Sequence, residues 1–306
     1  MANSTSWFVI INPTSGNGSS KEKWPEIHKL LITYKFEFEF TFTQYENHSI
    51  EIVQNAINQG FNQIICIGGD GTLHNIVNGV MLQNKMPSNQ IHIGVIPIGT
   101  GNDWVKSHEI SNNFENAIQT IKNGQLKLQD IGKINLENKN KTPIYFINLS
   151  GIGFDGFVVS KVNKYKHLGA IAYLSGALLG LFSFKNFHSK VHVNSVIIKS
   201  KTLMVLVGIC KYSGGGMQLT KKADPFDGLL DISIVKNIGK LDILKNVVNL
   251  FNGKITNHKK VETYKSKSIH IEITDANKPF IQADGELIGV GNLEISIVPK
   301  AFSFYC

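Results

Sequence analysis

Arginine is absent from this 306-residue sequence, so all 31 of its basic side chains are lysines. A guanidinium group can hold a phosphate through two parallel hydrogen bonds, whereas a lysine ammonium acts as a point charge. An anion bound by this chain must therefore be held by lysines, by backbone N–H groups or by a metal ion. The formal net charge of +8 has two interpretations: a lysine-rich genome, or attraction to an anionic membrane surface or to nucleotide phosphates.

Cysteine is also scarce. Cys66, Cys210 and Cys306 are odd in number and far apart, which excludes a disulfide framework and a cysteine metal site. The first residues, MANSTSWFVIIN, lack the basic segment and apolar core of a signal peptide. We therefore expect a cytoplasmic, reducing location. The ten histidines are scattered and follow no Ser-His-Asp order, so the sequence indicates no nucleophilic triad.

Long hydrophobic runs are absent too. The run LGAIAYLSGALLGLFSF, residues 168–184, is uncharged, and its 17 residues include three glycines. This length lies at the lower limit for crossing a bilayer. We interpret the run as a buried helix or as the wall of a lipid pocket in preference to a transmembrane span.

The order of the expected elements predicts two domains. Residues 1–133 alternate short apolar strands, such as QIICI and IHIGVIP, with helical patterns. This alternation predicts a three-layer α/β domain with a mostly parallel sheet. From residue 134 onward, runs of strands predict a β-rich sandwich domain, interrupted by helical segments at about 156–184 and 240–253.

A glycine-rich loop follows one of the buried strands. In IICIGGDGTLHNIVNG, the segment Gly68–Thr72 places one aspartate among three glycines. Such a turn lets the backbone and the next helix N-terminus approach a phosphate, and the aspartate would then meet the phosphate through a divalent cation. The alternative is a tight strand-to-helix turn with an aspartate cap.

Two similar loops follow neighbouring strands. They are NPTSGNG at 12–18 and PIGTGND at 97–103. Because ligands of open parallel sheets bind at the carboxyl ends of the strands, three such loops converging on one edge favour a nucleotide-phosphate site over three unrelated turns.

These three loops, in this order and spacing, resemble the diacylglycerol kinase catalytic-domain family, which includes bacterial lipid kinases and sphingosine kinases. The resemblance continues through GIGFDGFVV, SGGGMQLTKKADPFDGLLDISIV and ADGELIG, and so covers nearly the whole chain. GGDGT alone is shared with NAD kinases and, loosely, with phosphofructokinases. The segments PIGTGND and DGLLD are the ones that indicate a lipid kinase.

The resemblance implies an ATP-dependent kinase whose residues 134–285 form the β-rich lipid and metal domain and whose residues 286–306 return to the first domain. It also implies the nucleotide-binding residues, all of which lie in the first domain. They are Asn12, Pro13, Thr14, Ser15, Gly16, Thr43, Gly68, Gly69, Asp70, Gly71, Thr72, Leu73, His74, Asn75, Thr100, Asn102 and Asp103.

Three aspartates lie close together in ADPFDGLLD, at positions 224, 227 and 231. Oxygen-rich groups of this kind suit Mg²⁺ or Ca²⁺, although Asp-Gly is also a strong hairpin signal. The resemblance implies a structural Mg²⁺ held by Asp224, Asp227 and the backbone carbonyl of Leu229.

Two further acids lie in FIQADGELIG, at Asp284 and Glu286. On an extended segment, residues two apart share a face, so both side chains would point into one cleft. Phosphoryl transfer to an alcohol needs a group that accepts the hydroxyl proton, and the resemblance assigns that role to this motif. We place the base at Glu286, with Asp284 orienting it. The reverse assignment and a plain Asp-Gly turn remain alternatives.

The sequence thus predicts a transferase of phospholipid metabolism: an ATP- and Mg²⁺-dependent kinase acting on diacylglycerol or a related long-chain lipid alcohol. We expect a lipid partner at the membrane surface, peripheral attachment and no nucleic acid, and a homodimer is compatible with the sequence. The alternatives are an NAD-kinase-like enzyme with a soluble substrate, and a non-catalytic regulator that binds lipid or nucleotide.

Overall fold

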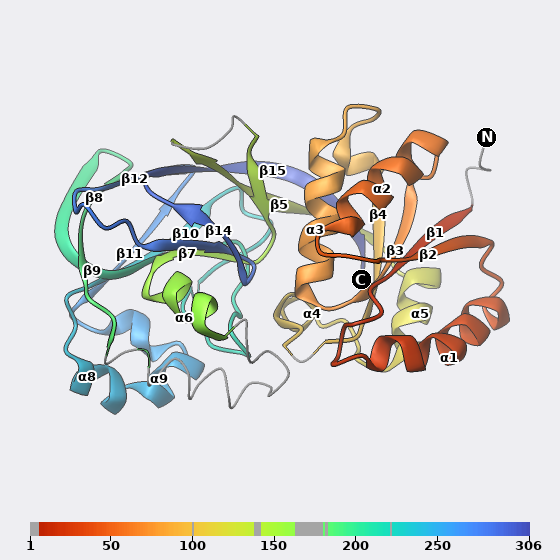
Figure 1. Ribbon diagram of the computed structural model, residues 1–306, viewed down its shortest axis with the longest axis horizontal. Helices are drawn as coiled ribbons and strands as arrows, with labels where there is room; N and C mark the ends of the chain where they lie inside the picture. The colour runs from red at the N-terminus through yellow and green to blue at the C-terminus, as the bar shows by residue number, and fades with distance from the viewer. Residues whose placement is uncertain (1–5, 100, 138–141, 163–179, 181–182, 221) are drawn as a thin grey trace. The chain divides into compact units, whose positions relative to one another are not determined.

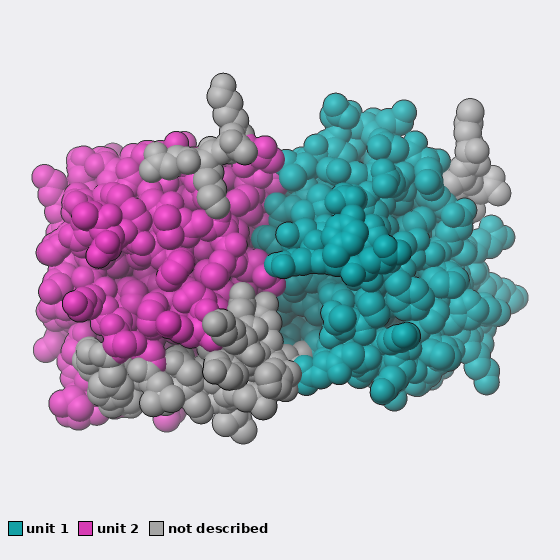
Figure 2. Space-filling model, in the orientation of Figure 1, with its two compact units in different colours: residues 1–129, 300–306 teal, residues 130–299 magenta. Residues whose placement is uncertain are grey.

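The computed structural model describes residues 6–99, 101–137, 142–162, 180, 183–220 and 222–306. The chain divides into two compact units, shown in separate colours in Figure 2. The first comprises Met1–Gln129 and Lys300–Cys306, and the second comprises Asp130–Pro299. The expected boundary at 133/134 thus lies four residues inside the second unit. The return to the first unit begins at Lys300, whereas residues 286–299, expected to return with it, belong to the second.

The first unit is a parallel sheet with helices on both faces (Figure 1). Its strands run in the order β2-β1-β3-β4, followed by the end of β15, and each strand is parallel to its neighbours in this order. The elements are β1 (Trp7–Ile11), α1 (Ser19–Thr33), β2 (Phe38–Phe42), α2 (His48–Gln59), β3 (Gln63–Gly68), α3 (Asp70–Leu82), η1 (Ser88–Gln90), β4 (His92–Pro97), α4 (Asp103–Ser107), α5 (Phe114–Asn123) and the start of β5 (Leu126–Leu136).

The core of the first unit explains why the strand sequences are continuous apolar runs. Alternate residues of β1 and β3 point to opposite faces, and both faces are covered by helices. Val9 and Ile11 pack with Ile27 of α1 and Ile118 of α5 in one cluster. On the other face α2 and α3 pack against each other and against β1 and β3. Both layers bury apolar side chains, as the three-layer prediction requires.

The second unit is β-rich, and the strands that neighbour one another in the order below are antiparallel. Its strands run in the order β14-β13-β7-β9-β8-β12-β15, with β10 beside β9 and β11 beside β10. The elements are the rest of β5, β6 (Ile144–Phe146), β7 (Leu149–Gly153), α6 (Phe154–Val162), β8 (Phe187–Val193), β9 (Val196–Gly208), β10 (Leu230–Lys236), α8 (Lys240–Lys245), α9 (Val247–Phe251), η3 (Lys254–Asn257), β11 (Val261–Ser266), β12 (Ser268–Ile273), β13 (Phe280–Ala283), β14 (Glu286–Val290) and β15 (Leu293–Tyr305).

One of the two expected helical segments of this unit differs from the structure. The segment 240–253 is two short helices, α8 and α9, separated at Asn246. Of the segment 156–184, α6 covers the start through Val162, while residues 163–179 and 181–182 lie outside the described residues. The fold class itself is confirmed: an α/β unit with a parallel sheet, followed by a β-rich unit.

Candidate functional site

The three glycine loops lie at the carboxyl ends of adjacent parallel strands. The first loop (12–18) follows β1, the second loop (68–72) follows β3, and the third loop (97–103) follows β4. Since β1, β3 and β4 are neighbours and run in the same direction, their carboxyl ends meet at one edge of the sheet. The convergence expected from the sequence is therefore present in the first unit.

Side-chain hydrogen bonds join the first loop to the second. Nδ2 of Asn12 donates to Oγ1 of Thr72 at 2.9 Å, and Oγ of Ser15 lies 3.4 Å from the same oxygen. Oδ1 of Asn12 accepts from both the backbone N–H and the hydroxyl of Thr14, at 3.1 and 2.8 Å. Thr72 is 4% exposed, so these bonds hold the two loops together with little competition from water.

Asp70 joins the second loop to the third. Its Oδ2 accepts the backbone N–H of Asp103 at 2.9 Å, and its Oδ1 accepts that of Trp104 at 3.3 Å. These are the first two residues of α4, whose N–H groups have no partner within the helix. The aspartate is thus a cap, as the alternative interpretation stated, but it caps a helix that begins 33 residues later. A metal role for Asp70 stays a prediction.

Glycine is required in these loops because they approach one another closely. A Cβ atom added at Gly99 would lie 2.4 Å from Oδ1 of Asn102 and 3.0 Å from the Cα of Gly69. Gly16 has φ +60°, and a Cβ there would lie 2.5 Å from Oγ of Ser19. The glycines therefore serve packing between loops as well as access for a ligand.

The remaining nucleotide-binding predictions fall in different environments. Leu73 and His74 are 1% and 5% exposed in α3, and His74 lies 3.3 Å from Nδ2 of Asn78, so both side chains lie in the interior of the unit. Thr43 follows β2, and its backbone N–H donates to the carbonyl of Ile11. Thr100 lies outside the described residues.

The DGE motif belongs to the second unit and forms a tight hairpin. Ala283 at the end of β13 pairs with Glu286 at the start of β14, and the two residues between them have φ +49° (Asp284) and +85° (Gly285). The expectation of an extended segment is therefore wrong. Asp-Gly is a favoured pair for a two-residue turn in which both residues need positive φ, and this local preference decides the backbone.

The Asp284 carboxylate accepts three backbone N–H groups at the start of β7. Oδ2 accepts from Ile147 at 3.0 Å, and Oδ1 accepts from Asn148 and Leu149 at 2.9 and 3.1 Å. The N–H of Asp284 in turn donates to the carbonyl of Leu149. Asp284 therefore fixes the turn on β7, a positioning role, and the proton-acceptor role of Glu286 stays a prediction.

Asp284→Asn is expected to destabilise the second unit. The carboxamide has one acceptor oxygen in place of two, and its NH₂ group would face N–H donors. The free energy of unfolding should therefore fall by about 1–3 kcal/mol. The thermal midpoint should fall by several degrees, since about 2–4 °C accompany each kcal/mol for a unit of this size. Calorimetry measures the change. An unchanged midpoint would contradict the positioning role.

Sequence reasoning assigned no role to Asp155, which lies beside the same turn. Nε2 of Gln282 donates to Oδ2 of Asp155, while Oε1 of Gln282 accepts the N–H of Gly285 at 2.8 Å. Burial raises the pKa of the Asp155 carboxyl to about 6, and the hydrogen bond from Gln282 opposes this shift. The signal was available in GIGFDGFVV, where a single acid interrupts an apolar run.

The raised pKa of Asp155 predicts a pH dependence of stability. The native state holds this proton more tightly than the unfolded chain, so the free energy of unfolding falls as pH rises from about 4 to about 6. Asp155→Asn has no charge to desolvate and keeps an acceptor for Gln282. We expect its thermal midpoint to exceed the parent's by about 2–5 °C at pH 7.5 and by less at pH 4.5.

A matched control is Asp275→Asn, because the backbone N–H and side chain of His188 lower the pKa of Asp275. This variant should not gain stability at pH 7.5. A midpoint for Asp155→Asn at or below the parent's at both pH values would contradict the prediction.

The predicted metal loop is occupied by internal contacts. Oδ1 of Asp224 accepts the N–H of Phe226, and Oδ1 of Asp227 accepts the N–H of Leu229, both at 3.0 Å. Nζ of Lys265 lies 2.6 Å from Oδ2 of Asp227 and 3.2 Å from Oδ2 of Asp231. Burial raises the pKa of the Asp231 carboxyl, and this ammonium opposes the shift.

A lysine ammonium thus lies where the carboxylates of the loop meet. In the described part of the chain, one group of three acid, histidine or cysteine side chains is close enough together to bind a metal ion. It consists of His192, His270 and Glu272, none of which belongs to this loop. Lys265 pairs with Asp227, one of the residues that the resemblance assigned to magnesium, and a site at Asp224, Asp227 and the carbonyl of Leu229 stays a prediction.

Lys265→Met is expected to lower stability and create a dependence on magnesium. The substitution removes the cation that pairs with Asp227 and Asp231. The free energy of unfolding should fall by about 1–2 kcal/mol, between the values for breaking an exposed and a buried salt bridge. Millimolar Mg²⁺ should restore part of the thermal midpoint in the variant and leave the parent unchanged. A parent midpoint that rises with Mg²⁺ would show instead that the ion displaces Lys265.

Comparison with known proteins assigns both units. Residues 6–134 match the model of the diacylglycerol kinase catalytic domain. Residues 149–306, more than half of the chain, match that of the YegS C-terminal NAD kinase beta sandwich-like domain. The chain belongs to the family that carries these two domains, the diacylglycerol kinase catalytic-domain family. The family resemblance drawn from the loops is thereby confirmed.

Individual relatives match along most of their length. The diacylglycerol kinase of Staphylococcus saprophyticus is 28% identical, over 92% of this chain and 88% of the relative. That of Staphylococcus epidermidis is 29% identical, over 92% and 85%. A crystal structure described as a diacylglycerol kinase from Bacillus anthracis covers 100% of this chain and 98% of its own, with a TM-score of 0.73 at 22% identity. At that identity the structural likeness shows the fold.

Proposed function

We propose that the protein is an ATP-dependent lipid kinase that phosphorylates the hydroxyl of diacylglycerol or a related long-chain lipid alcohol. The observation that carries this proposal is the hydrogen-bonded cluster of three glycine loops at one sheet edge, joined through Thr72 and Asp70. In a chain of this family, that cluster supports binding of the nucleotide phosphates.

The first unit supplies donors suited to phosphate. Without arginine, the groups available are lysines, loop N–H groups and the N-terminus of α3, a 13-residue helix whose macrodipole favours an anion. Asp70 caps α4 through both carboxylate oxygens, and its negative charge at the meeting point of the second and third loops suits a cation carried by the nucleotide. When bound, Mg²⁺ neutralises charge on the phosphate oxygens.

The second unit supplies the proton acceptor. Glu286 accepts the proton of the lipid hydroxyl as the oxygen attacks the γ-phosphorus, the bond from that phosphorus to the β,γ-bridging oxygen breaks, and ADP leaves with the pair of electrons. Asp284 holds the turn that precedes Glu286, the first residue of β14. The proton on Glu286 is then released to solvent, which restores the base.

An apolar acceptor fits the surroundings of α6. Phe184, the last residue of the run 168–184, contacts Phe154 and Phe157 with ring centroids 5.5 and 5.4 Å apart. We propose the run as part of the lipid entrance, although most of it lies outside the described residues. Within the described residues, no helix has both the length and the apolar character needed to cross a bilayer.

Transfer of radiolabelled phosphate from ATP to a panel of acceptors tests the function. The panel contains diacylglycerol, long-chain amino alcohols and NAD, with magnesium present or chelated. Labelled phosphatidic acid formed only with magnesium is the expected result. Labelled NADP would identify the soluble-substrate alternative, and ATP binding without any product would identify the regulator.

Peripheral attachment is tested separately by sedimentation with vesicles. We propose a cytoplasmic protein that the lysine excess attracts to anionic lipid, so that binding to phosphatidylglycerol vesicles should exceed binding to neutral vesicles and should weaken with salt. A homodimer, also proposed, would appear in sedimentation equilibrium. Equal binding to both vesicle types would contradict electrostatic attachment.

A further inference from the structure

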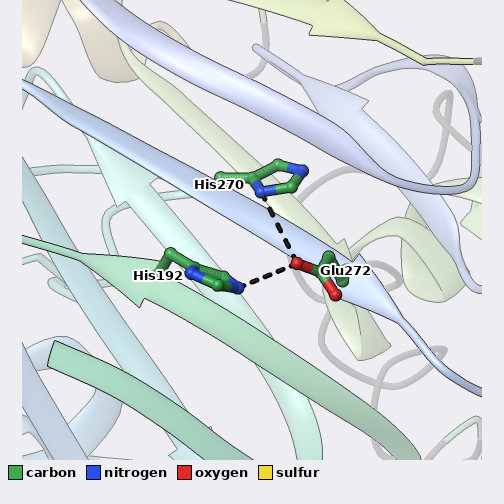
Figure 3. Close-up of side chains that lie close together, drawn as sticks. All are labelled: His192, His270 and Glu272. Atoms are coloured by element: carbon green, nitrogen blue, oxygen red, sulfur yellow. Dashed lines mark ion pairs between the residues drawn. The ribbon is translucent and has the colours of Figure 1, made fainter.

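Two neighbouring strands of the second unit bring two histidines and a glutamate together. β8 and β12 are antiparallel, and His192 pairs directly with His270. Glu272 follows two residues after His270 on the same strand. Side chains alternate along a strand, and direct cross-strand partners share a face. All three side chains therefore project from one face of the sheet, as Figure 3 shows.

The ligand atoms of these side chains lie close together. Nε2 of His192 is 2.8 Å from Oε1 of Glu272, and Nδ1 of His270 is 3.8 Å from the same oxygen. The three ligand atoms are within 4.8 Å of one another. Neighbouring ligands of a tetrahedral zinc ion are about 3.3 Å apart, given metal–ligand bonds of about 2.0 Å. Small side-chain rotations on the two paired strands would lengthen the first of these distances and shorten the second to that value.

Nε2 of His192 lacks a hydrogen-bond partner among the described residues. Nε2 of His192 is buried and, among the described residues, makes no hydrogen bond of acceptable geometry, although a carboxylate oxygen lies 2.8 Å away. A cation bound by both atoms at about 2.0 Å would give each of them a partner. Both imidazoles also line a surface groove, so an ion from solvent can reach them.

A second layer of hydrogen bonds orients His270. Its Nε2 lies 2.9 Å from Oε1 of Glu137, and Oε2 of Glu137 accepts a hydrogen bond from Nδ2 of Asn292 at 2.8 Å. Oδ1 of Asn292 accepts the backbone N–H of Ile273. With a proton on Nε2 held by Glu137, the lone pair on Nδ1 faces Glu272. Metal-binding histidines are commonly held by a carboxylate in this way.

We propose that His192, His270 and Glu272 form a binding site for a divalent transition-metal ion of the zinc class. Two imidazole nitrogens and one carboxylate oxygen suit Zn²⁺ and not Mg²⁺. With three protein ligands, the fourth position is open to water or to an anion. The site lies apart from the DGE turn in the sequence and does not depend on the proposed kinase activity.

Lys190 holds the carboxylate when no metal is bound. It pairs with Glu272 across the two strands, and its Nζ lies 3.2 Å from both carboxylate oxygens. A bound metal ion competes with this ammonium for Glu272. We therefore expect Lys190→Met to bind Zn²⁺ more tightly than the parent. Removal of a residue with a purely structural role would not raise the affinity for Zn²⁺.

The test is competition for Zn²⁺ between the full-length, metal-stripped protein and a chromophoric chelator. We expect one ion per chain. His192→Gln and His270→Gln should weaken binding by about a hundredfold or more, and Glu137→Gln by about ten- to a hundredfold, the range for residues that orient metal ligands. Lys190→Met should strengthen it severalfold. Co²⁺ in place of Zn²⁺ should give the visible absorption of a four-coordinate site in the parent.

The matched control is His188→Gln. His188 is also on β8, is more exposed and pairs with a single carboxylate, Asp275, at 3.0 Å. Its substitution should leave Zn²⁺ affinity unchanged. Stoichiometric binding that survives both His192→Gln and His270→Gln, affinity no tighter than about 100 μM in the parent, or equal loss in His188→Gln would overturn the proposal and leave an ion-pair cluster only.

Discussion

Glu286→Gln is expected to lower kcat for lipid phosphorylation by about a hundred- to ten-thousandfold, equivalent to about 3–5 kcal/mol of barrier. Glutamine has nearly the same shape but cannot accept the hydroxyl proton. The KM for ATP should change little, because the three nucleotide loops belong to the first unit and Glu286 to the second. The loss should therefore fall on turnover. Steady-state kinetics with varied ATP at saturating lipid measure both quantities.

Two comparisons make this result specific. Glu294→Gln removes an exposed carboxylate from β15 in the same unit and should leave kcat unchanged. Asp284→Asn should lower stability through the turn. If Glu286→Gln turned over normally while folded Asp284→Asn were inactive, the base would be Asp284. Full activity in both variants would show that the motif is a turn alone.

Asp70→Asn is expected to lower kcat/KM for ATP by about ten- to a hundred-and-fiftyfold and to lower the thermal midpoint by a few degrees. An asparagine oxygen can accept from Asp103 or Trp104, but its NH₂ group would face the other N–H. Loss of one charge-assisted hydrogen bond amounts to about 1.5–3 kcal/mol. Because this bond joins the second and third loops, the loss should affect binding of the nucleotide as well as folding.

Asn113→Ala provides the control for stability alone. Asn113 caps α5 in the same unit, where its side chain accepts the N–H of Asn116 at 3.0 Å. Its loss should lower the midpoint by a comparable amount without changing kcat/KM. Should Asp70→Asn behave like Asn113→Ala, Asp70 would be a cap only. Partial recovery of Asp70→Asn activity at raised Mg²⁺ would indicate that the carboxylate also meets the nucleotide's magnesium.

Local sequence determined most of the fold. Apolar runs such as IICI and HIGVIP, separated by helical patterns, specify buried parallel strands because both faces of each strand must pack against helices. The positions of the three loops follow from the same order of elements, since parallel neighbours end at one sheet edge. Turn chemistry was equally local: Asp284-Gly285 adopts the hairpin that this pair favours, in place of the extended segment that simple alternation suggested.

The partners of polar side chains were not predictable in the same way. Asp70 caps α4, Asp284 holds Ile147–Leu149, and Lys265 meets Asp227 and Asp231, each across a wide gap in the sequence. The histidine pair His192 and His270 depends on the register of β8 and β12. A shift of one residue in that register would send their side chains to opposite faces.

The sequence by itself thus determined the family, the α/β-then-β order of the chain and the composition of the loops. Periodicity and turn preference act between near neighbours and leave a readable pattern. Only the tertiary structure decided which carboxylates act as caps, which meets a lysine, and which lies between two imidazoles. A carboxylate can accept N–H, ammonium or metal with similar geometry, and the choice depends on what the folded backbone brings within about 3 Å of it.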